Sequence, residues 1–150
     1  MTLIEDAKRG KTPPEVEAVA RKEGVDPAAL SRLVARGRVV IPRNAGREIR
    51  PIGIGETLTT KVNLNIGSSR GIADPDAEVE KAVVAMEAGA DTVMDLSTGG
   101  DLDYIRRKIL KAVEIPVGTV PIYQAEVAGR LTSQGLFDAL ERQAKDGVDF

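Results

Sequence analysis

The chain contains no cysteine, histidine or tryptophan, and only two phenylalanines and two tyrosines among its 150 residues. Without cysteine or histidine it cannot ligate an iron–sulfur cluster or a thiolate zinc site, and it offers neither a thiol nucleophile nor an imidazole base. A metal ion held by this sequence would need oxygen ligands. The missing side chains therefore exclude disulfide scaffolds, cysteine-ligated metal modules and histidine-based catalysis within the chain itself.

Long hydrophobic runs and an excess of one charge are also lacking. No stretch approaches the ~20 apolar residues of a membrane span, and the first ten residues carry charges where a signal sequence would need an apolar segment. The 21 Lys and Arg residues nearly balance the 23 Asp and Glu residues, which gives a net charge of −2. We therefore expect a cytoplasmic protein, without an overall field that attracts membranes or nucleic acid.

Positive charge is nevertheless concentrated between residues 21 and 50, where eight basic residues stand beside three acidic ones. A helix is predicted from Glu15 to Glu23, and Asp26 is placed to cap a second one after the turn at Gly24. This basic helix pair, residues 15–38, has two open interpretations. It is either a nucleic-acid-binding or regulatory element similar to a helix-turn-helix, or a small capping module whose arginines are solvated or contact a partner subunit.

Short strands and helices alternate along the rest of the chain. Strands are predicted at 39–41 and 49–54, and later ones begin near Val62, Thr92, Val117 and Val148, at intervals of 30, 25 and 31 residues. Such intervals are typical of the strand–helix units of an (α/β) barrel. The predicted helices follow Asp74–Pro75 as far as Gly89 and then span 101–113, 123–130 and 133–145, the last with Leu136, Phe137 and Leu140 facing inward.

These patterns predict an α/β fold with two domains. Residues 1–58 form a small amino-terminal α+β domain. Residues 59–150 form the first three βα units and the start of the fourth strand of a TIM-type (β/α)8 barrel, which is incomplete in this chain. A strand that begins at Val148 would leave a buried edge unpaired at Phe150, so we expect the chain to be the amino-terminal part of something longer.

Polar residues at the carboxyl ends of the predicted strands are the candidate site, because barrels place their ligands there. Asn63 and Asn65 lie on one strand face, where their carboxamides either contact a ligand or bond to one another. Met94 fills core by default, and Tyr123 is a rim hydrogen-bonder or a packing residue. The loop 97–100 could hold a phosphate at a helix terminus, but a tight turn with Asp101 as the helix cap is favoured.

Five segments together resemble the phosphomethylpyrimidine synthase family of thiamine biosynthesis, in order and over about the first third of that family's length. They are the segments Arg36–Asn44 (RGRVVIPRN), Gly53–Gly55 (GIG), Thr60–Gly67 (TKVNLNIG), Met94–Gly100 (MDLSTGG) and Pro116–Tyr123 (PVGTVPIY).

The resemblance implies a radical S-adenosylmethionine lyase that converts 5-aminoimidazole ribonucleotide to 4-amino-5-hydroxymethyl-2-methylpyrimidine phosphate. It also implies a homodimer with a 4Fe–4S cluster, S-adenosylmethionine and zinc. Substrate contacts of the family fall on Asn65, Met94 and Tyr123 in this sequence. No catalytic residue and no metal ligand of the family has a counterpart in this chain, so we expect the 150 residues alone to be inactive.

Three alternatives stay open at this point. The first is the paralogous branch that makes 5-hydroxybenzimidazole from the same ribonucleotide, because nothing in this third of the family's length separates the two. The second is a non-catalytic regulatory or nucleic-acid-binding fragment that uses the helix pair 15–38. The third is a non-catalytic partner of a second polypeptide that supplies the missing strands and the cluster.

Overall fold

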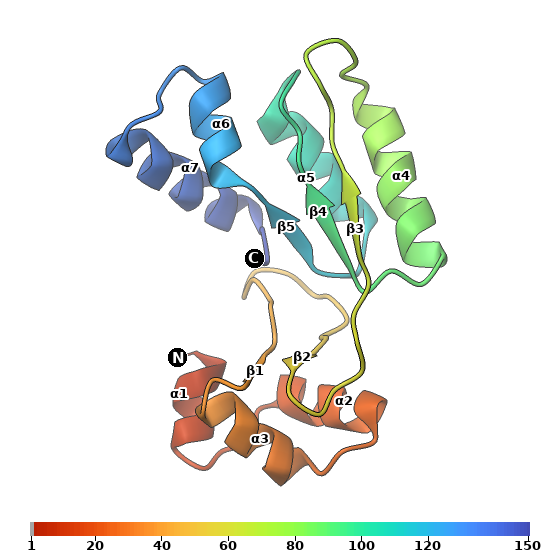
Figure 1. Ribbon diagram of the computed structural model, residues 1–150, viewed down its shortest axis with the longest axis vertical. Coiled ribbons are helices and arrows are strands. Elements are labelled where there is room, and N and C mark those ends of the chain that lie inside the picture. The colour runs from red at the N-terminus through yellow and green to blue at the C-terminus, as the bar shows by residue number, and fades with distance from the viewer. Residues whose placement is uncertain (1) are drawn as a thin grey trace. The chain divides into compact units, whose positions relative to one another are not determined.

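The computed structural model describes residues 2–150 and divides the chain into two compact units (Figure 1). The helical unit contains the chain up to Pro42 together with Pro51–Lys61, and the sheet unit contains Arg43–Arg50 together with Val62–Phe150. The expected domains, 1–58 and 59–150, follow chain order. The two units instead alternate along the chain, because residues 43–50 belong to the sheet unit and residues 51–61 to the helical unit.

Three helices and one strand pair build the helical unit. The helices are α1 (Leu3–Lys8), α2 (Pro14–Glu23) and α3 (Pro27–Ala35), and β1 (Val39–Val40) pairs antiparallel with β2 (Ile54–Gly55). The predicted helix pair is confirmed, with Gly24 in the left-handed conformation at the end of α2 and Asp26 capping α3. The short α1 was not predicted, although Thr2 and Glu5 form a reciprocal capping box at its start.

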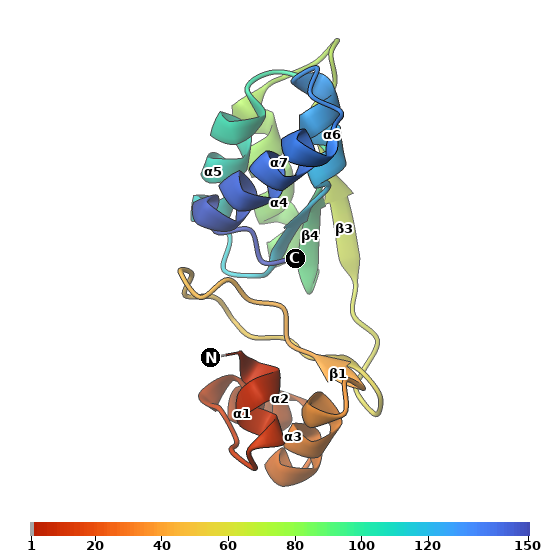
Figure 2. The same ribbon diagram turned by 90° about the vertical axis from the view of Figure 1, so that its left-hand side faces the viewer.

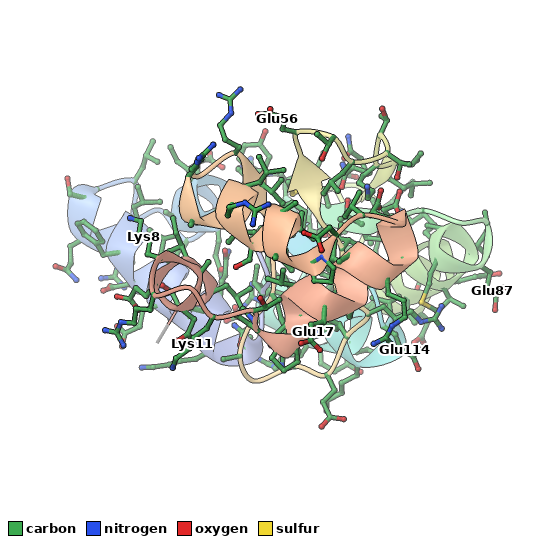
Figure 3. The ribbon with its side chains drawn as sticks, turned by 90° about the horizontal axis from the view of Figure 1, so that it is seen from below. Lys8, Lys11, Glu17, Glu56, Glu87 and Glu114 are labelled. Atoms are coloured by element: carbon green, nitrogen blue, oxygen red, sulfur yellow. The ribbon has the colours of Figure 1, made fainter. Side chains whose placement is uncertain are left out.

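The core of the helical unit is aliphatic. Val16, Val19 and Ala20 of α2 pack with Leu30 and the other apolar residues of α1, α3 and β1, and all four are at most 1% exposed. Charged side chains occupy the outer surface, where Figure 3 shows Lys8, Lys11 and Glu17. The helices are thus amphipathic in the usual way, with one apolar stripe each.

A three-stranded parallel sheet forms the centre of the other unit, in the order β3 (Asn63–Ile66), β4 (Thr92–Asp95) and β5 (Val117–Thr119). Each strand is followed by helical structure: α4 (Pro75–Glu87), α5 (Leu102–Ala112), and then α6 (Pro121–Val127) with α7 (Ser133–Asp146). The predicted βα alternation is therefore confirmed. Figures 1 and 2 show α4 and α5 side by side on one face of the sheet.

The core of the sheet unit lies between the strands and these two helices. Ile66, Val93 and Val117 each contribute one buried side chain from β3, β4 and β5, and Ile105 and Ile109 of α5 are fully buried against them. In a parallel sheet covered on this face, such residues are expected to be branched and apolar. The side chains between them in the sequence point to the other face of the sheet.

The segment after α7 lies beside β5 and bonds to it, but it does not form the strand that was expected to begin at Val148. Asp149 N–H donates to Val117 O at 2.9 Å, and Thr119 N–H donates to Phe150 O at 3.1 Å. The end of the described chain therefore lies along β5, on the edge opposite β3. On the other edge, Leu64 of β3 is 37% exposed, and Val62, just before β3, is 58% exposed.

Residues 43–50 close the amino end of the sheet. Arg47 makes an ion pair with Asp149, whose side chain is fully buried, and its guanidinium also donates to Leu110 O at 2.9 Å and Val113 O at 2.7 Å. Asn44 N–H donates to the same carboxylate at 2.8 Å. Arg47 thus satisfies carbonyls that helix α5 leaves without partners at its end.

Two further expectations about secondary structure and packing are wrong. No strand spans 49–53, because Pro51 has no N–H to donate and Arg50 N–H instead bonds Glu114 O at 2.8 Å. In α7, Phe137 and Leu140 do not face inward but are exposed at 66% and 44%, and Leu136 is only half-buried.

The reason for the second error is a close approach at the start of α7. A Cβ on Gly135 would lie 1.9 Å from Arg130 O, so only glycine allows this contact. The small residues Gly135 and Ala139, with Gln143, therefore form the buried stripe of α7. No helix among residues 2–150 is both long enough and apolar enough to cross a membrane.

Candidate substrate-binding face

One row of residues crosses the sheet on the face opposite α4 and α5. Asn65 pairs with Met94, and Met94 pairs with Gly118 in the next strand. Register partners in a sheet point to the same side, and the neighbouring pair Val93 and Val117 is buried on the helix side. In Figure 1, no helix of residues 2–150 lies in front of β3 and β4 on this open face.

A chain of hydrogen bonds orients the amide of Asn65. Thr92 Oγ1 donates to Asn63 Oδ1 at 2.8 Å, and Asn63 Nδ2 donates to Asn65 Oδ1 at 2.9 Å. Asn65 Oδ1 therefore already accepts one hydrogen bond, and no bond of the exposed Asn65 Nδ2 donors occurs within residues 2–150. The sequence interpretation that Asn63 and Asn65 bond to one another is confirmed, and this bond orients the Asn65 amide.

The other two predicted residues occupy different positions. Met94 lies beside Asn65 in the row and is half-buried, while Asp95, the next residue, is buried on the helix side. Tyr123 belongs to the first turn of α6, directly after β5, and is 41% exposed. The strand register thus brings Asn65 and Met94 together, and places Tyr123 in the helix that follows the row instead of within it.

Buried side chains brace the loops that leave β3 and β4. Asp95 accepts from Ser97 N–H at 2.9 Å and from Ser97 Oγ at 2.5 Å, and Ser97 Oγ accepts from Ser68 N–H at 3.0 Å. Burial raises the pKa of Asp95, against the hydrogen bonds from Ser97 that lower it. The two loops at the carboxyl ends of β3 and β4 are thereby tied together beside the open row.

The loop 97–100 is a tight turn, as favoured from the sequence. Asp101 caps α5 by accepting from Tyr104 N–H at 3.0 Å. Thr98 N–H donates to Ser68 O at 2.8 Å, and Ser97 N–H is taken by Asp95. Two backbone donors of this loop are therefore occupied by the protein and do not face a phosphate.

A second polar cluster fixes α5 against α6 and α7. Arg106 is 2% exposed and forms ion pairs with Asp103 and with Asp146, the latter at 2.5 Å, and it donates to Gln124 at 3.1 Å. Burial raises the pKa of Asp103, but hydrogen bonds from Arg142, Arg106 and Gln124 outweigh this and lower it to about 2. The cluster holds the helices behind the sheet.

Sequence reasoning missed both clusters. One local signal was the two-residue spacing of Asp95 and Ser97, which is typical of a side chain that bonds the backbone two residues on. Asp103 lies three residues before Arg106 on α5, a spacing typical of helical ion pairs, but Gln124 and Asp146 lie on α6 and α7, where no local pattern connects them to Arg106.

The residues present do not fit an iron–sulfur cluster, because the sequence has no cysteine. Among residues 2–150, no group of three or more Asp and Glu side chains is arranged to hold a metal ion. The predicted site residues offer a donor at Asn65, a polarisable thioether at Met94 and a phenol at Tyr123.

Comparison of the sequence with known proteins shows the family. The model of the radical SAM ThiC family matches residues 2–150. The chain belongs to that family. It is 54% identical to phosphomethylpyrimidine synthase 1 of Methanosarcina mazei, 52% to the phosphomethylpyrimidine synthase of Methanopyrus kandleri and 50% to that of Pyrococcus furiosus. Each alignment covers 100% of this chain and 36–37% of the relative, so the chain spans a little over a third of their length.

Proposed function

We propose that this member of the radical SAM ThiC family forms the first part of the substrate-binding barrel of a phosphomethylpyrimidine synthase. The substrate in this proposal is 5-aminoimidazole ribonucleotide, and the product is 4-amino-5-hydroxymethyl-2-methylpyrimidine phosphate. The similarity over the whole chain supports the proposal, and the parallel order β3-β4-β5 with its βα alternation supports the barrel.

The observation that carries the proposal is the free amide donor of Asn65, held in place beside Met94 at the carboxyl edge of the sheet. A ribonucleotide presents ring-nitrogen and ribose oxygen acceptors that such a donor can bond. Met94 then supplies shape to the pocket, and Tyr123 a hydroxyl from the rim. Asn63 and Thr92 act through Asn65, because Asn63 Nδ2 donates to the acceptor oxygen of Asn65 and Thr92 Oγ1 donates to Asn63 Oδ1.

The cofactors of the proposed reaction are not ligated by this chain. In the family, S-adenosylmethionine and a 4Fe–4S cluster supply the radical chemistry; with no cysteine to ligate the cluster, the 150 residues bind substrate and do not perform that chemistry themselves. We further propose a lyase that works in the cytoplasm as a homodimer and uses zinc, with all metal ligands outside this chain.

Genetic complementation tests the proposal. The longest reading frame that carries this chain should restore growth without thiamine to a strain that lacks its own phosphomethylpyrimidine synthase. The same reading frame with Asn65→Ala should fail or need more expression, whereas Gln134→Ala, which removes an exposed carboxamide on α7, should rescue fully. Failure of the unaltered frame, or formation of 5-hydroxybenzimidazole instead of the pyrimidine, would contradict the assignment.

A further inference from the structure

The third member of the open row, Gly118, is covered by an aromatic ring. A Cβ built on Gly118 would lie 2.5, 2.7 and 2.9 Å from three adjacent ring carbons of Phe150. Because Gly118 is the register partner of Met94, this missing side chain points to the same face as Met94 and Asn65. The ring of Phe150 therefore takes the place of a side chain in the row, which reads Asn65, Met94, Phe150 across the sheet.

The position of Phe150 is fixed by backbone hydrogen bonds to β5. Thr119 N–H donates to Phe150 O at 3.1 Å, and the preceding residue bonds Val117 O at 2.9 Å, so the segment is anchored along β5. The residue as a whole is 44% exposed. The ring carbons nearest Gly118 thus lie on the face of the sheet that carries Met94 and Asn65, in a chain with only four aromatic residues.

We propose that the Phe150 ring, seated on Gly118, is a stacking platform for the heterocycle of the ligand whose polar edge Asn65 reads. The inference rests on the proposed function and names two further specificity-determining residues for it. A flat aromatic surface next to a thioether and a carboxamide donor recognises a planar, nitrogen-containing ring better than a sugar phosphate alone. Glycine at position 118 is required because any larger residue would displace the ring.

The test measures ligand affinity in the longest protein that carries this chain. The probes are 5-aminoimidazole ribonucleotide and ribose 5-phosphate, which lacks the heterocycle. Phe150→Leu keeps an apolar side chain but removes the flat ring, and it should weaken binding of the ribonucleotide about fivefold to tenfold. The affinity for ribose 5-phosphate should stay the same, which a general loss of folding would not allow.

Gly118→Ala should weaken ribonucleotide binding to a similar extent, because its Cβ pushes the ring aside. Combined with Phe150→Leu, its effect should be smaller than the sum of the two, since both act on the same ring. Phe137→Leu replaces the other phenylalanine, 66% exposed on α7, and Gly71→Ala adds a Cβ that meets nothing within 4 Å. Both controls should bind like the parent.

Three outcomes overturn the platform. If the parent protein binds the ribonucleotide and Phe150→Leu binds it equally well, the platform alone is refuted. The same holds if Phe150→Leu weakens both probes by the same factor. If the parent binds no 5-aminoimidazole ribonucleotide at all, the proposed function fails, and the platform fails with it.

Discussion

Replacing Arg47 by methionine should destabilise the sheet unit strongly. The change leaves the fully buried Asp149 carboxylate without its ion-pair partner. It also removes the guanidinium nitrogen that donates to both Leu110 O and Val113 O. Breaking a buried ion pair from one side costs about 3–5 kcal/mol. Two backbone N–H groups still bond Asp149, so we expect the lower end, about 3 kcal/mol of unfolding free energy.

The assay is urea unfolding of the full chain, followed by amide hydrogen exchange of β4 and β5, because these strands report on the sheet unit alone. Arg50→Met is the matched control. Arg50 lies three residues away and pairs with Glu114 at 2.9 Å, but both side chains are largely exposed, so its loss should cost less than about 1 kcal/mol. If the unfolding free energies of Arg47→Met and Arg50→Met differ by less than about 1 kcal/mol, the reasoning is refuted.

Three further predictions concern single positions. The pKa of Asp103 is lowered to about 2, so the stability that its charged form contributes is present above about pH 4 and is lost as the pH falls towards 2. In acid titrations followed by circular dichroism, Asp103→Asn should remove part of this loss of stability. An unchanged titration profile would contradict the prediction. Gly99→Ala should lower the melting temperature, because its Cβ would lie 2.2 Å from Ser69 O, and a variant as stable as the parent would show that the two loops can separate freely. Thr92→Val breaks the bond that orients Asn63 and should weaken ligand binding a few-fold with little change in stability; a calorimetric titration with unchanged affinity would remove Thr92 from the site.

Local sequence signals predicted most of the secondary structure. Asp26, Asp74 and Asp101 each precede a helix that the structure shows, and each accepts a hydrogen bond from that helix. The alternation around Asn63 and Asn65 identified β3 and the face that both residues share. These features depend on residues close together in the chain, so the sequence alone determines them.

The features that sequence missed depend on residues far apart. Arg47 and Asp149 are 102 positions apart, and the ring of Phe150 covers Gly118 only because the segment after α7 lies along β5. The buried face of α7 was predicted wrongly because large apolar residues are usually buried, whereas the close approach at Gly135 buries the small residues of the helix instead. Long-range register and close backbone approaches are not encoded in any local period.

The central claim is that Asn65 contacts the substrate, and a direct titration tests it. Calorimetry of 5-aminoimidazole ribonucleotide with the longest protein that carries this chain should show binding that Asn65→Ala weakens by about 1–3 kcal/mol, roughly 5- to 150-fold. Gln134→Ala should leave the affinity unchanged. Equal affinities for the parent and Asn65→Ala would contradict the account of the site.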